Sequence, residues 1–548
     1  MILAVMGVLT VILIVFSNVP SIFTNKPMVS LPGQGDVMGS LTETAWTHQK
    51  VQQFLGIPYA ESPSGKLRFK PPIPRAPWTS PLKATKYSLR CPEKLTLSKE
   101  NIDLEDCLSL CVYTKDVHGK LPIMFYIYGG GFANGTAQEF PPGYLLEKDI
   151  VLIVTQYRVG ALGWLSTRSE DIPGNVAFMD IILALKWVQK YASHFGGDPS
   201  QVTIFAQSGG AIITGLLTLS PNVPDNLYHR LILQSASVLM LDAEKEPIKL
   251  ANQFCQRAQC SCSNIEEINS CLMNLSVSTL LEISSDNQYV MSVDDFHGYV
   301  PKQPNEMDPR PSIRNIEIMS GVTKQEGSFL LALIFDAIRH TITNTTTTND
   351  IFNILYEQLK FKDPQGLLKP MLTKSIFHQS NELRSNDLKA SIPGFIEVCN
   401  YFMKFPIYTL MQKYSHFNSK QTIYLYTFDY MGEHTRFGYE FGNEWYPFNG
   451  GVHHSDDNIY LFSTHKLNEN DRTIAKKKVD LWTSFAANGT PSFDGVEMPR
   501  FDGMDGPYFK IDKEITFGSD FRDEFFSTVD DPDREEKFIR KNVCFGVC

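Results

Sequence analysis

The chain has 548 residues, a length that by itself suggests roughly three or four domains, although large α/β enzymes exceed that rule. Its net charge of −10 contains no long run of one sign, which argues against nucleic acid or an anionic membrane surface as a partner. Hydrophobic residues at 43% and aromatic residues at 12% can supply a large buried core.

The N-terminal stretch from Ile2 to Phe16 is almost wholly apolar. It is shorter than a membrane-spanning helix of about 20 residues and suits the hydrophobic region of a signal peptide. We therefore predict a signal peptide over residues 1–21 and a single domain over 22–548, in a protein that is secreted or held in the secretory lumen. No Lys or Arg precedes the stretch, so an uncleaved anchor is the alternative, and we expect no other membrane contact.

A glycine-rich loop follows the first strongly apolar stretch of the core. Ile123 to Tyr128 is apolar and rich in β-formers, which predicts a buried strand, and it runs into Gly129-Gly130-Gly131-Phe132. No G-x-G-x-x-G or GK[ST] pattern follows, so a phosphate loop is excluded. Such a backbone can instead present bare N–H groups to an anion, as an oxyanion hole requires.

Strand and helix patterns then alternate. Ile150 to Thr155 reads as a buried strand, and Asn175 to His194 as a long helix that is apolar nearly all round. Phe195–Pro199 ends that helix and turns the chain into a third strand. This alternation predicts an α/β fold with a large, mostly parallel sheet and helices on both faces.

That third strand ends in a serine at a tight turn, Val202-Thr203-Ile204-Phe205-Ala206-Gln207-Ser208-Gly209-Gly210-Ala211, before an apolar helix to Leu219. A nucleophile elbow has this form, because a sharp strand-to-helix turn exposes the serine hydroxyl. Small residues are needed two before and two after the serine, where strand and helix nearly touch. Gly210 meets that need, and Ala206 stands where Gly is usual.

The C-terminal half adds three further strand patterns and two polar residues that follow them. Residues 232–235, 316–321 and 422–430 read as strands, and 340–395 and 471–487 as helical, whereas 240–315 looks like an irregular excursion from the sheet. Glu326 follows the strand at 316–321, and His453 and His454 follow the strand at 422–430. Because strand ends hold the sites of parallel sheets, we expect these side chains near Ser208.

Ten cysteines behind an export signal imply disulfides. We expect Cys91 with Cys107, Cys260 with Cys271, and Cys399 with Cys544, although spacing alone does not fix connectivity. A zinc site at Cys260-x-Cys262 is disfavoured because no His ligands stand at metal spacing nearby. Four cysteines have no assigned partner: Cys111, Cys255, Cys262 and Cys548.

Export also makes N-glycosylation relevant, because N-x-S/T sequons are modified on surface loops of exported proteins. We predict glycans at Asn274, Asn344 and Asn488. Asn134 is also in a sequon, but it follows the glycine-rich loop that we assign to the active site, so we expect it to stay unmodified.

Short motifs occur along the chain: Phe54–Tyr59, Glu105–Leu108, Tyr128–Phe132, Tyr157–Ala161, Gly174-Asn175, Phe195–Pro199, Ser208 in its elbow, Glu326-Gly327 and His454. Through their order and spacing, the chain resembles the type-B carboxylesterase/cholinesterase family over about residues 35–545.

The resemblance implies an α/β-hydrolase fold and hydrolysis of a small-molecule carboxylic ester. Ser208 would be the nucleophile, His454 the base and Glu326 the orienting acid, in the chain order of α/β-hydrolases. Backbone N–H groups of Gly130, Gly131 and Gly209 would hold the oxyanion. No cofactor and no metal are called for. The spacing G-x-x-H favours His454, which leaves His453 as a surface or packing residue.

Two further ion pairs are implied as parts of the fold, Arg68 with Glu105 and Arg158 with Asp180. Cys111 stands where Asn is common in the family, and Gln207 where Glu is frequent. The loop between Cys91 and Cys107 contains no Trp, so it lacks the aromatic face that a quaternary ammonium needs. We therefore expect a neutral ester, as for a carboxylesterase, and not acetylcholine.

Two alternatives to catalysis remain open: an inactive adhesion protein, and a protein that binds an ester with little turnover. Retention of all three triad residues argues against the first, and Ala206 is the only support for the second. Cys548 could link two chains in a homodimer or pair within its own chain.

Overall fold

The structure is a computed structural model of the chain. It describes residues 26–526 except 94–103, 285–288, 295, 344, 362, 364, 378–387, 442–445 and 447. The predicted signal peptide, Asn344, Cys544 and Cys548 therefore lie outside the described residues. Within these ranges, no helix combines the length and the apolar character that crossing a membrane requires.

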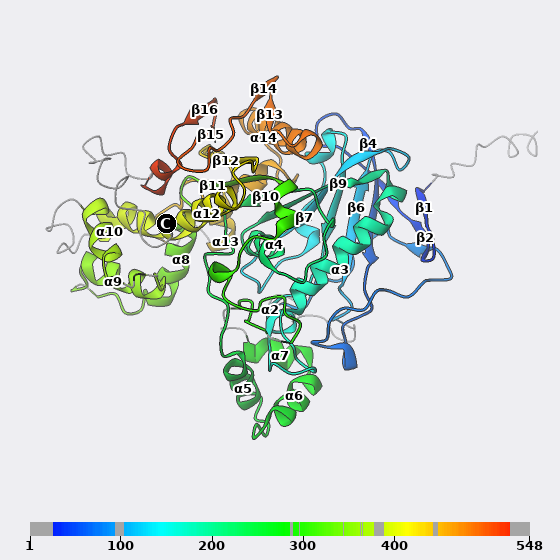
Figure 1. The fold of residues 1–548 in the computed structure, drawn as a ribbon, viewed down its shortest axis with the longest axis horizontal. Coiled ribbons are helices and arrows are strands. Elements are labelled where there is room, and N and C mark those ends of the chain that lie inside the picture. The colour runs from blue at the N-terminus through cyan, green and yellow to red at the C-terminus, as the bar shows by residue number, and fades with distance from the viewer. Residues whose placement is uncertain are drawn as a thin grey trace, which may run out of the picture.

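One large sheet runs through the molecule (Figure 1). Its eleven strands have the order β16-β15-β12-β11-β10-β9-β7-β8-β6-β4-β3. Every pairing from β15 to β8 is parallel, and the pairings beyond them at both edges are antiparallel. The strands are β3 (Ser40–Glu43), β4 (Lys50–Pro58), β6 (Ser109–Thr114), β7 (Leu121–Ile127), β8 (Val151–Thr155), β9 (Gly197–Gln207), β10 (Arg230–Gln234), β11 (Glu317–Thr323), β12 (Ile423–Phe428), β15 (Tyr508–Ile511) and β16 (Ile515–Gly518).

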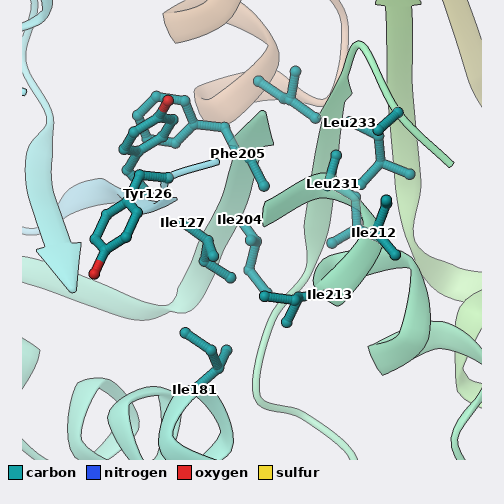
Figure 2. Close-up of a cluster of buried hydrophobic side chains, with 14 of the residues drawn as sticks. Tyr126, Ile127, Ile181, Ile204, Phe205, Ile212, Ile213, Leu231 and Leu233 are labelled. Carbon is teal, nitrogen blue, oxygen red and sulfur yellow. The ribbon is translucent and has the colours of Figure 1, made fainter. Parts of the chain in front are cut away.

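Alternating side chains of the central strands divide between the two faces of the sheet, as a period of two requires. In Figure 2, Ile127 and Ile204 point toward Ile181 and Ile213 of the helices α3 (Val176–Tyr191) and α4 (Gly209–Leu219). Tyr126 and its strand neighbour Phe205 point the other way. On that opposite face, Trp482 of α14 (Glu469–Asn488) packs against Tyr426 of β12. The predicted parallel sheet with helices on both faces is thus confirmed.

The sequence interpretation was wrong for residues 240–315, which form more than an irregular excursion. Three helices stand there, α5 (Pro247–Arg257), α6 (Ile265–Asn274) and α7 (Val277–Ser284). In α5, the buried residues Ala251, Phe254 and Cys255 recur at helical spacing. The other α-helices in the described part of the chain are α2 (Gly160–Trp164), α8 (Gly327–Ile338), α9 (Thr348–Gln358), α10 (Leu368–Ile376), α12 (Leu388–Phe417) and α13 (Arg436–Phe441). Its small strands are β1 (Met28–Leu31), β2 (Gly35–Met38), β5 (Leu82–Lys83), β13 (Ser492–Phe493) and β14 (Val496–Glu497).

Among the described residues, three disulfides close loops outside the sheet. Cys91 is joined to Cys107 and Cys260 to Cys271, and a third bond that the sequence left unassigned joins Cys255 to Cys262. Cys111 and Cys399 are buried free thiols, and burial raises the pKa of Cys111 to about 12, so that it stays protonated. Within the described residues Cys399 is therefore unpaired. Its expected partner, Cys544, lies outside the described residues.

Both expected structural ion pairs are present and buried. The Arg68 guanidinium lies 2.6 Å from Glu105, and that of Arg158 lies 2.7 Å from Asp180, which is fully buried. Arg158 donates to both carboxylate oxygens of Asp180 and also to the carbonyl of Lys70. These bonds link the segment after β8 to helix α3.

Replacing Arg158 with Met is expected to lower the free energy of unfolding by about 3–5 kcal/mol, because it leaves the Asp180 carboxylate buried without its cation. Arg75→Met is the matched control. Its guanidinium lies 3.0 Å from Glu61 with both side chains about one-third exposed, so the loss there should be about 0–1 kcal/mol. Chemical denaturation of both variants measures the difference, and equal losses would contradict this account of the pair.

Candidate active site

Ser208 stands alone between the last residue of β9 and the first residue of α4. Its backbone has φ 55° and ψ −127°, a strained conformation of the kind that a nucleophile elbow imposes. A Cβ at Gly210 would lie 2.2 Å from the carbonyl oxygen of Ile127 and 2.6 Å from that of Tyr128. The predicted need for a small residue two after the serine is therefore confirmed. Ala206 is fully buried, so the extra methyl is accommodated.

Strand ends carry the other two candidate residues to Ser208. β9, β10, β11 and β12 are parallel neighbours, so their carboxyl ends lie at one edge of the sheet. Glu326 follows β11 by one short turn and precedes α8. A bridge between Gln325 and His453 joins that turn to the segment after β12. This bridge places the next residue in each segment, Glu326 and His454, side by side.

The three side chains form one hydrogen-bonded line. His454 Nδ1 lies 2.7 Å from Glu326 Oε2, and His454 Nε2 lies 2.9 Å from Ser208 Oγ. The other oxygen of Glu326 accepts the backbone N–H and the hydroxyl of Thr323, at 2.9 and 3.0 Å. With the carboxylate so fixed, Nδ1 carries a proton and Nε2 is free to accept one from the serine.

The charges of Glu326 and His454 shift the pKa values of both groups in the directions that a general base needs. Burial raises the pKa of the Glu326 carboxyl, but the charge of His454 and its hydrogen bond outweigh it, so that the net pKa is lowered and Glu326 stays ionised. For His454, burial alone would lower the pKa, yet the Glu326 carboxylate raises it above the ordinary 6.5. The imidazole is thus a stronger base than a free histidine.

The ester hydrolysis that the family resemblance implies is expected to fail as the pH falls through the pKa of His454, because the base must be neutral to accept the Ser208 proton. Since that pKa is raised, the acid limb of kcat/KM should lie above about 6.5, the value for an unperturbed histidine. A pH–rate profile with a neutral ester measures it. A limb well below that value would contradict the assigned pair.

The glycine-rich loop lies against the elbow. Gly130 and Gly131 have φ 121° and 58°, which favour glycine. A Cβ at Gly209 would lie 3.5 Å from the N of Gly131 and 3.3 Å from that of Phe132, so these amides adjoin the start of α4. Among the described residues, neither Gly130 nor Gly131 donates its N–H to another backbone group, and the N–H of Gly209 belongs to the unpaired first turn of a helix. Of the three predicted oxyanion donors, Gly131 thus adjoins Gly209, which follows Ser208 directly, and Gly130 precedes Gly131 in the same loop.

His453 corrects part of the sequence interpretation. His453, expected as a surface or packing residue, is fully buried, and the adjacent His454 is 3% exposed. The His453 ring packs against Phe437, Phe441 and Phe329, and its Nδ1 lies 2.8 Å from Ser328 Oγ. A packing role is thus right and a surface position wrong.

Sequence reasoning missed two side chains that touch the line, Phe329 and Gln207, and a third, Ser455, that contacts Gln207. Phe329 lies over His454, with 4.8 Å between ring centroids. Gln207, noted only as a departure from the family pattern, lies 3.1 Å from His454 Nε2 through its amide nitrogen and donates to Ser455 Oγ. The sequence offered one signal for these contacts: Gln207 directly precedes Ser208, and Ser455 directly follows His454. Across the described part of the chain, no group of three or more His, Cys, Asp or Glu could hold a metal ion.

The chain is similar to known proteins over most of its length. A model of the carboxylesterase family matches residues 25–529. The chain is 30% identical over 523 residues to glutactin of Drosophila melanogaster, covering 89% of this chain but only 49% of glutactin. It is 29% identical over 489 residues to carboxylesterase 1C of Mus musculus, covering 84% of this chain and 85% of that protein. It is 29% identical over 497 residues to juvenile hormone esterase of Tribolium castaneum, covering 83% of each chain.

The family match, the mostly parallel sheet and the serine elbow agree with one another. The chain belongs to the carboxylesterase family and has its α/β-hydrolase fold.

Proposed function

We propose that the protein is a serine hydrolase that cleaves neutral carboxylic esters through an acyl-enzyme on Ser208. The observation that carries this proposal is the hydrogen-bonded line from Ser208 through His454 to the buried Glu326. A hydroxyl is a poor nucleophile until a base removes its proton, and this line supplies that base. Similarity to carboxylesterases over most of the chain supports the same class of reaction.

In the proposed cycle, His454 Nε2 takes the Ser208 proton as Oγ attacks the ester carbonyl carbon. The negative charge that develops on the carbonyl oxygen is held by the N–H groups of Gly130, Gly131 and Gly209. His454 then returns the proton to the leaving alcohol as the C–O bond breaks, which leaves the acyl group on Ser208. Water, deprotonated by the same histidine, releases the acid, and Glu326 stabilises the imidazolium in both halves.

The surroundings favour an uncharged, apolar substrate. Phe329 covers His454, and four further rings stand around His453 and α13: Phe437, Phe441, Tyr446 and Phe448. The loop between Cys91 and Cys107 offers no Trp face for a quaternary ammonium. Purified protein should therefore hydrolyse p-nitrophenyl butyrate with a much higher kcat/KM than butyrylthiocholine. A preference for the cationic ester would overturn the assignment of substrate class.

The second candidate function is ligand binding or adhesion without turnover. Its support is the similarity to glutactin, whose name specifies no catalytic activity. Stoichiometric acylation of Ser208 without release of acid would favour this candidate, and sustained turnover would reject it.

We further propose that the protein works after export. The three disulfides support this, because such bonds persist in oxidising compartments. Asn274 and Asn488 are exposed at the ends of α6 and α14, where a glycan can be carried. Treatment of secreted protein with a glycosidase, followed by mass spectrometry of both sequons, tests the proposal.

A further inference from the structure

Gln207 occupies the Nε2 side of the catalytic histidine. As the last residue of β9 it lies on the same face of the sheet as Phe205, two positions earlier, and its side chain is only 4% exposed. Its Nε2 lies 3.1 Å from His454 Nε2 and 2.5 Å from Ser455 Oγ. A Cβ at Gly129 would lie 2.6 Å from Gln207 Oε1, so the glycine leaves the space that this carboxamide fills.

Two hydrogen-bond donors share the single acceptor site on His454 Nε2. His454 Nδ1 donates to the Glu326 carboxylate, so a neutral ring has one lone pair, on Nε2. Two donors face that lone pair, the Ser208 hydroxyl at 2.9 Å and the Gln207 amide at 3.1 Å. A hydrogen bond from the amide favours the neutral ring and occupies part of the site that must receive the serine proton.

We propose that Gln207 is a positioning residue for His454: anchored to Ser455, its amide holds the Nε2 edge of the neutral ring and competes there with Ser208. This inference rests on the proposed esterase function. When Nε2 receives the Ser208 proton it becomes a donor, so the amide must release it and keep Ser455 alone as acceptor. Gln207 therefore stabilises the resting base more than the imidazolium.

The other charged and titratable groups around the ring set the background for this effect. Glu326 lies at Nδ1, and the His453 ring is 6.5 Å from that of His454 between centroids. The carboxylates of Glu440 on α13 and of Asp457 also favour a positive charge on the ring. Gln207 contributes no charge of its own. A carboxylate in its place would add a negative charge and an acceptor directly at Nε2.

The test compares Gln207→Met and Gln207→Glu with the unaltered protein. The readout is the second-order rate constant for labelling of Ser208 by a fluorophosphonate across the neutral pH range, which needs no natural substrate. In the Met variant, which lacks the donor, the pKa of the acid limb of this pH profile should rise by roughly half a unit. In the Glu variant it should rise by about one unit or more. Gln256→Glu, on the exposed side of α5, has the same charge change and should leave the limb in place.

The outcomes separate this inference from the proposed function. If the unaltered protein takes no label, the esterase proposal itself fails. If it is labelled and the Met variant moves the limb down, or neither variant moves it, Gln207 does not act on the base and this inference alone is overturned. A uniform loss of labelling at every pH, with a lowered unfolding temperature, would likewise overturn it, because that pattern reflects packing only.

Discussion

Replacing Ser208 with Ala is expected to lower kcat for ester hydrolysis by about 10⁴–10⁶, because no other group can form the acyl-enzyme. The fold should survive, since the change removes one hydroxyl group, which donates its hydrogen bond to His454 Nε2. The measurement is hydrolysis of p-nitrophenyl butyrate, together with the thermal unfolding midpoint of each protein.

Ser278→Ala is the control for this substitution, because Ser278 lies exposed on α7. It should retain full activity. Residual activity of a few per cent in the Ser208 variant, in a sample free of other esterases, would mean that another residue is the nucleophile.

Replacing Glu326 with Gln is the second large effect, with an expected loss in kcat of about 10⁴. The amide removes the charge that stabilises the imidazolium. It also places an N–H₂ group or a carbonyl where Thr323 now donates two hydrogen bonds to a carboxylate oxygen. With the N–H₂ toward His454, Nδ1 must accept a hydrogen bond, so the base is left in the wrong tautomer. With the N–H₂ toward Thr323, two donors face each other at the backbone N–H of Thr323.

Glu440→Gln is the matched control, since the Glu440 carboxylate lies 3.7 Å from His453 and does not contact His454 in the line. We expect a far smaller loss of kcat in this variant. Comparable losses in the two variants would show that general electrostatics around the histidines, and not the oriented contact of Glu326, supports the reaction.

Local patterns were sufficient to predict the central parallel strands β7 to β12, and the resemblance to a family selected the candidate site residues at their ends. Buried parallel strands are continuous apolar runs, so residues 123–128 and 150–155 were placed within one or two residues of β7 and β8. Ser208, Glu326 and His454 follow strand ends, and the parallel order of those strands brings their side chains together.

Features that depend on tertiary packing were not predicted. Helices α5–α7 lie in a polar, cysteine-bearing segment whose helices bury narrow faces, and the Cys255–Cys262 bond follows from their packing. His453 is buried because aromatic side chains of α8 and α13 enclose it. The hydrophobic pattern of the residues around His453 in the sequence does not predict this burial. The contact between Gln207 and His454 joins residues 247 positions apart.

The most direct test of the central claim is mass spectrometry of the protein after reaction with a fluorophosphonate, read against turnover of p-nitrophenyl butyrate. This account predicts one adduct per chain, located on Ser208, with complete loss of turnover as the adduct forms. Sustained turnover without an adduct on Ser208, or a folded protein that neither reacts nor turns over ester, would contradict it.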